Sequence, residues 1–207
     1  MLGIFSTFST NNRINKMMRD RIKTGIIGCI PSSWRDGYTF CGPARSFIDM
    51  GFTKSFVIPV GNLYDEHAFD QMLEEADAIY LPGGNTFGFL CMLQCRNAIP
   101  KLRKFYERGG SFFGSSAGSI LMGPSIAIAS FADENYFGLT DLEGLGFVDF
   151  AIKPHWDWWA THETMFRNFS KMTKTPLFGL REGQGIIVDE DGKRTFIGGK
   201  PKAFNAW

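Results

Sequence analysis

The 207-residue chain has little excess charge of either sign, no long apolar run, and only four cysteines and three histidines. Its 22 lysines and arginines are matched by 21 aspartates and glutamates, and a net charge of +1 gives no broad basic surface for nucleic acid. No stretch approaches the roughly 20 apolar residues that a membrane-spanning helix needs. Residues 1–20 also place apolar residues before basic ones, the reverse of a secretory signal. We therefore expect a cytoplasmic protein without nucleic-acid or membrane partners.

The cysteines are Cys29, Cys41, Cys91 and Cys95, which form no C-x-x-C pair and match no zinc spacing. Cys91 and Cys95 share one face of a predicted helix, where we expect buried, reduced thiols. The chain also lacks the G-x-x-x-x-G-K-[ST] and G-x-G-x-x-G patterns that bind nucleotide phosphates. These absences predict a protein with no metal and no cofactor.

The length suits one domain spanning residues 1–207. Short apolar runs such as "DAIYLPGG" and "GSFFGSS" alternate with stretches of helical spacing such as "YDEHAFDQMLEEA". This alternation predicts an α/β fold, with a parallel sheet covered by helices on both faces.

Other parts of the chain give more local predictions. We expect residues 1–20 to form an edge element, and "SIAIAS", after Gly123, to be a strand followed by an irregular loop and a second strand. The stretch "THETMFRNFSKM" is expected to be a helix. The tight turn favoured by Asp191-Gly192 predicts a hairpin near the end of the chain.

The stretch "GSSAGS", residues 114–119, satisfies G-x-S-x-G where a predicted strand meets a predicted helix. In a nucleophile elbow, small neighbours allow a sharp turn that exposes the serine oxygen, and the next amide faces the developing oxyanion. Ser116 would be that nucleophile and the N–H of Ala117 that donor. The competing interpretation is an ordinary small-residue turn between a strand and a helix.

A nucleophilic serine needs a base, and the chain offers only His67, His155 and His162. His155 follows the alternating run "FVDFAIKP", so it is expected at the end of a strand, at the sheet edge where open α/β folds place their sites. His67 and His162 lie in or at the start of predicted helices, which favours solvated or capping roles.

A third residue must orient the imidazole. The acidic residues that follow the elbow and could serve are Asp133, Glu134, Asp141, Asp157 and Glu182. Glu182 lies among glycines after an apolar segment, whereas Asp157 is only two residues from His155. Spacing alone leaves both open.

The stretch "LPGGNTFGFL" predicts a strand that runs through glycines into a helix. Consecutive amides near a helix N-terminus suit an anion or an oxyanion. A tight turn in which Asn85 or Thr86 caps the helix is equally compatible with the sequence.

Four motifs, taken in chain order, resemble those of the peptidase E and cyanophycinase family of serine hydrolases. They are "LPGGNTF", "GSSAGS", "KPHW" and "GLREGQGI", and the resemblance runs from about residue 20 to residue 200. The resemblance implies an α/β three-layer sandwich with a mostly parallel central sheet, like that of class I glutamine amidotransferases. It also implies Ser116 as nucleophile, His155 as base and Glu182 as its orienting acid. Gly84 would join Ala117 as an oxyanion donor. Asn85 and Thr86 would support the wall of the site.

The chain departs from the family where substrate is selected. Met165 stands where the family has the first arginine of an "ETREQR"-like stretch, although Arg167 lies close by. Four residues, Trp156, Trp158, Trp159 and Phe166, could either wall a substrate pocket or pack in the core. Lys153, Arg181 and Arg35 could meet an acidic group, but solvated surface charges are the favoured interpretation.

The resemblance implies a serine peptidase of the dipeptidase type that acts on a small peptide, with Asp-Xaa dipeptides as one possible substrate. We expect a monomer or homodimer. The alternatives are a ligand-binding protein of the same fold without catalysis, and a cyanophycinase-like exopeptidase on β-linked Asp-Arg. The loop of residues 131–145 is long and polar enough to be a lid.

Overall fold

The structure, a computed structural model, describes residues 1–7, 20, 25–34, 46–48 and 51–205. Its centre is a seven-stranded sheet in the order β3-β2-β4-β5-β1-β8-β9. The strands are β1 (Leu2–Phe5), β2 (Ile26–Cys29), β3 (Lys54–Val57), β4 (Ala78–Leu81), β5 (Ser111–Ser115), β8 (Gly185–Val188) and β9 (Arg194–Ile197). The first five are parallel, whereas β8 and β9 each run antiparallel to their neighbours.

Side chains alternate between two apolar cores, one on each face of this sheet. In β4, Ile79 and Leu81 join the larger core, whereas Ala78 and Tyr80 join the smaller one. Such runs without polar residues are typical of parallel strands that are covered on both faces. The strands are therefore buried from both sides, and function is left to the loops at their ends.

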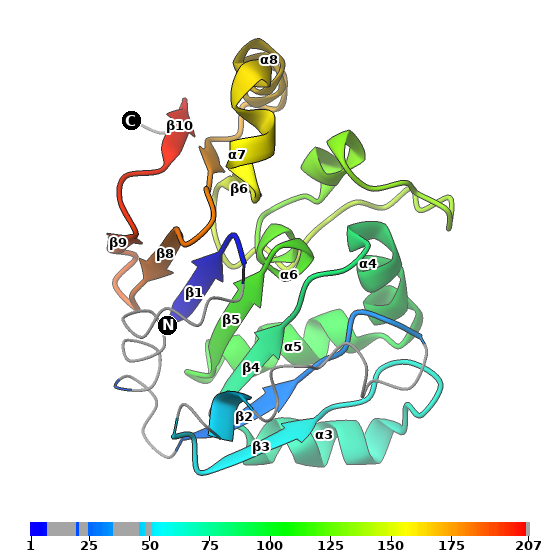
Figure 1. Ribbon diagram of the computed structural model, residues 1–207. Coiled ribbons are helices and arrows are strands. Elements are labelled where there is room, and N and C mark those ends of the chain that lie inside the picture. The colour runs from blue at the N-terminus through cyan, green and yellow to red at the C-terminus, as the bar shows by residue number, and fades with distance from the viewer. Residues whose placement is uncertain (8–19, 21–24, 35–45, 49–50, 206–207) are drawn as a thin grey trace.

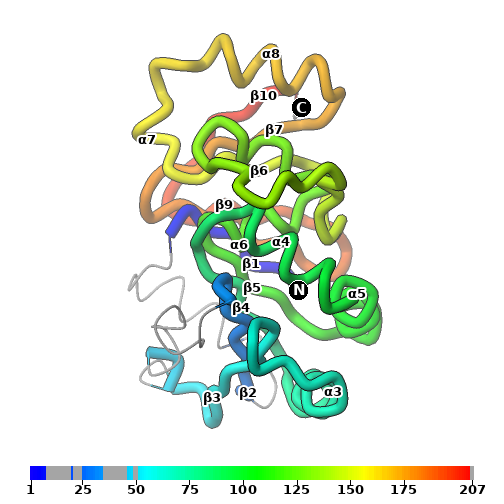
Figure 2. Tube along the Cα trace, turned by 90° about the vertical axis from the view of Figure 1, so that its right-hand side faces the viewer, coloured from blue at the N-terminus to red at the C-terminus, as the bar shows by residue number. Residues whose placement is uncertain are grey.

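Helices α3 (Glu66–Glu75) and α5 (Ala98–Glu107) lie on one side of the sheet (Figure 2). They bury Phe69, Leu73, Leu102 and Phe105 in the larger core. Helix α4 (Thr86–Cys95) follows β4, and the short α6 (Ala117–Leu121) follows β5. On the opposite face, residues 46–48 are helical and Phe47 packs in the smaller core.

A second, three-stranded sheet lies beyond the carboxyl ends of β1 and β5 (Figure 1). It consists of β6 (Ala151–Lys153), β7 (Leu177–Gly179) and β10 (Lys202–Phe204), and it carries α7 (Trp156–Trp159) and α8 (Glu163–Thr173). Two 3₁₀ turns, η1 (Ala127–Phe131) and η2 (Ala160–His162), complete the described elements. This small sheet brings His155 and Glu182 toward the end of β5.

The predicted α/β fold with a mostly parallel sheet is confirmed, as are the helix at α8 and the hairpin of β8 and β9. In the hairpin, Gly192 takes a φ of +77°, as the turn requires. Within the described residues, no helix is both long and apolar enough to cross a membrane.

Three local predictions were wrong. Residues 2–5 form a strand between β5 and β8 rather than an edge element, because every side chain of β1 is buried. Within the "SIAIAS" stretch, the 3₁₀ turn η1 begins at Ala127 where a strand was expected. The side chains of Ile128 and Ala129 are buried from this turn. Cys91 is half-buried and Cys95 exposed, so they are not buried thiols. Arg35 and Cys41 lie outside the described residues.

Candidate active site

Ser116 lies between β5 and α6 on a backbone with φ +51° and ψ −117°, which few residues other than glycine adopt. The two glycines of G-x-S-x-G make this turn possible. A Cβ at Gly118 would lie 2.0 Å from the carbonyl oxygen of Leu81, and one at Gly114 would lie 2.6 Å from the carbonyl oxygen of Gly118. The strand and helix therefore meet too closely for any side chain at either position.

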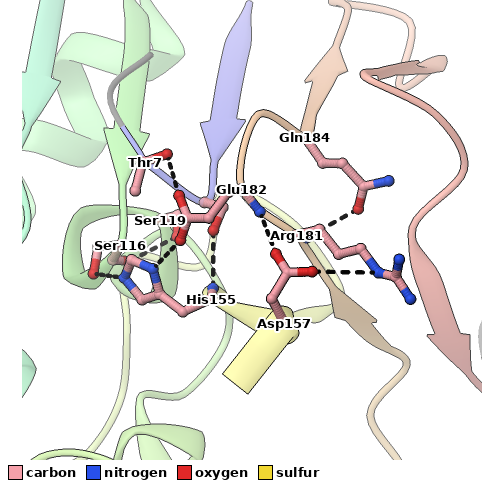
Figure 3. A network of polar contacts seen from close by, with 9 residues as sticks. Thr7, Ser116, Ser119, His155, Asp157, Arg181, Glu182 and Gln184 are labelled. Carbon is pink, nitrogen blue, oxygen red and sulfur yellow. Dashed lines mark hydrogen bonds and ion pairs between the residues drawn. The ribbon is translucent and has the colours of Figure 1, made fainter. Parts of the chain in front are cut away.

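His155 directly follows β6 and Pro154, also with a positive φ, +57°. Its Nε2 lies 2.9 Å from Ser116 Oγ (Figure 3). Its backbone N–H donates to Ser6 Oγ at 2.9 Å, which ties the histidine to the end of β1. On its open side the imidazole stacks on the exposed indole of Trp158.

Glu182 lies in the turn between β7 and β8 and reaches the other side of the imidazole. Its Oε1 lies 2.6 Å from His155 Nδ1, and its Oε2 accepts a hydrogen bond from Thr7 Oγ1 at 2.6 Å (Figure 3). Burial raises the pKa of the Glu182 carboxyl, but the hydrogen bonds from Thr7 and His155 outweigh it, and the pKa lies below its ordinary value. The carboxylate is thus held ionised against the imidazole.

Asp157, the rival acid in the sequence, does not meet His155. Its Oδ2 accepts the backbone N–H of Glu182 at 2.9 Å, and its Oδ1 lies 3.7 Å from Arg181 Nε. The backbone N–H of Arg181 in turn donates to Gln184 Oε1. Asp157 therefore fixes the loop that carries Glu182, and Figure 3 shows the two acids on different sides of that loop.

Gly84 and Ala117, the expected oxyanion donors, flank Ser116. A Cβ at Gly83 would lie 3.2 Å from the Cβ of Ser116, which places the Gly83-Gly84 turn against the serine. Gly84 has a φ of +148°, and a Cβ there would lie 2.5 Å from Ser32 Oγ, so only glycine fits. Ser32 Oγ also donates to the carbonyl oxygen of Gly83 at 2.6 Å. The Gly83-Gly84 turn therefore lies beside Ser116 and is held there by Ser32.

Asn85 and Thr86 stabilise the start of α4. Asn85 caps the helix by accepting the N–H of Gly88 at 2.8 Å. Asp133 Oδ2 accepts both the N–H and the hydroxyl of Thr86, at 2.8 and 2.5 Å. Because Asn85 also donates to the carbonyl oxygen of Glu134, the 131–145 loop is bonded directly to the turn that carries Gly84.

Other expected substrate contacts have different surroundings. Trp156 is 1% exposed and packs among Gly179, Phe166 and Phe204, so it belongs to the core and does not line an open pocket. Arg167 lies over the ring of Phe204 and 3.9 Å from Glu163. Among the described residues, neither side chain makes a hydrogen bond, ion pair or ring contact with Ser116, His155 or Glu182.

Sequence reasoning missed Ser6, Thr7 and Ser32, which all hold the site in place. Each follows the last residues of a buried parallel strand, β1 or β2. The carboxyl ends of parallel strands lie at the same edge of the sheet. Small polar residues directly after apolar runs could therefore have been predicted to lie near the site.

A model of peptidase family S51 matches residues 6–196. The chain belongs to this family. Peptidase E of Streptomyces coelicolor is 34% identical over 139 residues, which cover 63% of this chain and 56% of that protein. Peptidase E of Shewanella amazonensis is 32% identical over 159 residues, covering 73% and 66%. These S51 relatives are thus matched over less than two thirds of their own length.

Solved structures show the same fold for this S51 chain. A peptidase E-type protein of Listeria monocytogenes superposes with a TM-score of 0.69 at 19% identity, covering 98% of this chain and 96% of that one. A peptidase from an acI-B1 actinobacterium gives 0.62 at 17% identity, covering 89% and 81%. The mostly parallel sheet of this S51 chain is therefore the amidotransferase-like sheet that the resemblance implied.

Proposed function

We propose that this S51 protein is a serine peptidase that hydrolyses the amide bond of a small peptide through an acyl-enzyme on Ser116. One observation carries the proposal. A continuous line of short contacts runs from Ser116 Oγ through both nitrogens of His155 to the carboxylate of Glu182. This arrangement is the one that serine acyl transfer needs.

In the first half-reaction, Ser116 Oγ attacks the scissile carbonyl and its proton passes to His155 Nε2. The C–N bond then breaks, and His155 returns the proton to the leaving amine. In the second half-reaction, His155 takes a proton from water, the resulting hydroxide attacks the acyl ester, and Ser116 leaves with the proton. Glu182 keeps the Nδ1 proton facing itself, so that Nε2 is the basic nitrogen, and its charge stabilises the imidazolium.

The tetrahedral intermediates place negative charge on the former carbonyl oxygen. The backbone N–H groups of Gly84 and Ala117 would donate hydrogen bonds to this oxyanion, since both turns lie beside Ser116. Each such donor is typically worth about 100- to 1,000-fold in rate. Both donors belong to the backbone. The backbone conformation of the turns at Gly84 and Ser116 therefore decides where these two N–H groups point.

The expected substrates are dipeptides with a free amino terminus. The Streptomyces and Shewanella relatives are called peptidase E, and a Drosophila melanogaster relative, 29% identical over 169 residues, is called a probable alpha-aspartyl dipeptidase. An N-terminal aspartate is accordingly the first residue to test. Met165 stands in the position of the family arginine. Another cation would therefore have to bind the side-chain carboxylate of an N-terminal aspartate.

The decisive experiment measures hydrolysis of unblocked dipeptides by the wild type and by Ser116→Ala, with N-terminal Asp, Asn, Glu, Arg and Leu. We expect turnover by the wild type only, and an acyl adduct on Ser116 that mass spectrometry of a quenched reaction detects. Circular dichroism checks that Ser116→Ala folds. Turnover by Ser116→Ala would refute the nucleophile, and no turnover of any peptide would favour a ligand-binding protein without catalysis.

A further inference from the structure

Lys153 is a buried cation. It is the last residue of β6, two positions before His155, and only 2% of its surface is exposed. The sequence favoured a solvated surface charge, and this prediction was wrong because α7 and α8 cover the side chain. Burial lowers the pKa of the Lys153 ammonium to about 8, while the negative charge of Asp133 acts in the opposite direction.

The ammonium group faces aromatic rings instead of hydrogen-bond acceptors. Its Nζ lies 4.2 Å from the ring centre of Trp159 and 5.8 Å from that of Phe166. Across the described part of the chain, Lys153 Nζ makes no hydrogen bond and no ion pair. An ammonium has three hydrogen-bond donors, and here none of them meets an acceptor on the described part of the chain.

The aromatic contacts account for only part of this arrangement. A cation over an aromatic ring gains less free energy than the removal of an unpaired ion from water costs. A methionine or leucine would fill the same space beside Trp159 and Phe166 without that cost. The lysine is therefore better explained by an anion that arrives from outside the chain.

Lys153 is linked to both walls of the active site. Through β6 and Pro154 it leads to His155, and its ring partner Trp159 is adjacent to Trp158, which stacks on that histidine. On the other side, the charge of Asp133 reaches Lys153, and Asp133 holds Thr86 beside the Gly84 turn.

We propose that Lys153 selects the substrate, by binding the side-chain carboxylate of an acidic residue on the amino side of the scissile bond. The inference rests on the proposed function, because it places the scissile carbonyl at Ser116. A carboxylate supplies the acceptors that the ammonium lacks, and its single charge matches the single cation. Lys153, instead of Arg167, thus takes the place of the cation missing at Met165.

The test compares kcat/KM for Asp-Leu and Asn-Leu, two substrates of nearly equal shape that differ in charge. The proteins are the wild type, Lys153→Met and Arg167→Met, since methionine keeps most of each aliphatic stem. The Asp/Asn ratio does not depend on how much of a variant is folded. We expect the wild-type ratio to fall about 10- to 100-fold in Lys153→Met and to persist in Arg167→Met.

A binding experiment separates failure of this inference from failure of the proposed function. Titration calorimetry of Asp-Leu and Asn-Leu into Ser116→Ala, with and without Lys153→Met, needs no turnover. Tighter binding of Asp-Leu that Lys153→Met abolishes would support the subsite even if no peptide were cleaved. The inference would be overturned if the wild type showed an Asp/Asn ratio near one. It would also be overturned if a high wild-type ratio were lost in Arg167→Met but kept in Lys153→Met. Neither result would contradict the proposed peptidase activity. If nothing is cleaved, equal binding of the two peptides would overturn it as well.

Discussion

The indole of Trp158 lies flat against the imidazole of His155, with ring centres 4.8 Å apart and planes inclined by 13°. Trp158 is 71% exposed, so the contact shields one face of the proposed base from solvent without burying the indole. It belongs to the "WDWWA" segment, residues 156–160, which directly follows the histidine.

Trp158→Ala should lower kcat/KM by about two- to five-fold, because a cation on an exposed aromatic face gains about 0.5–1 kcal/mol and the imidazolium forms during the reaction. Trp158→Phe keeps a ring and should retain most of the activity. Steady-state kinetics on the best dipeptide would check both variants. A loss in Trp158→Phe equal to that in Trp158→Ala would indicate that the indole contacts substrate instead.

The two acids near His155 should differ greatly in importance. Glu182→Gln should reduce kcat by about 10³- to 10⁴-fold, since the amide favours the wrong histidine tautomer. Asp157→Ala should cost about ten-fold, through looser positioning of the Glu182 backbone, and Asp157→Asn less, because an amide oxygen can still accept that N–H. Equal losses for Asp157→Asn and Glu182→Gln would mean that the assignment of the orienting acid is wrong.

The Glu182 carboxyl also predicts how stability depends on pH. Its pKa in the folded protein is below the ordinary value, so ionised Glu182 contributes stability above pH ~4.5 that is lost as the pH falls through the lower folded pKa. Urea unfolding between pH 3 and 7 should therefore show a difference between wild type and Glu182→Gln that shrinks on acidification. Thr7→Val should reduce the same pH-dependent part, since Thr7 donates to the carboxylate. A difference that does not change with pH would exclude this contribution.

Gly118→Ala tests the close contact under the serine. A methyl group 2.0 Å from the Leu81 carbonyl oxygen must push α6 away from β4. Overpacking of this kind typically costs about 1–3 kcal/mol, and displacement of Ser116 should remove activity as well. Gly138→Ala is the matched control, because its Cβ would meet open space and only its φ of +59° resists the change. A Gly118→Ala protein as stable and active as the control would contradict the elbow geometry.

Much of the site could be predicted from local sequence. The small residues around Ser116 fit a close turn, and the alternating run before His155 indicated a strand end. The glycines around Gly84 also matched a turn that no side chain could enter. Patterns of this kind are readable because steric limits and strand periodicity act over a few neighbouring residues.

The sequence by itself thus determined the α/β class, the elbow, and the short set of histidines and acids from which a triad could be drawn. Only the tertiary structure decided that Glu182 and not Asp157 meets His155, that β1 lies inside the sheet and brings Ser6 and Thr7 to the site, and that Lys153 is buried. The reason is physical: these contacts join residues that are up to 175 positions apart, through strand order and the packing of α7 and α8 over β6. Local periodicity carries no information on strand order or on this helix packing. Both depend on which buried surfaces meet when the whole chain folds.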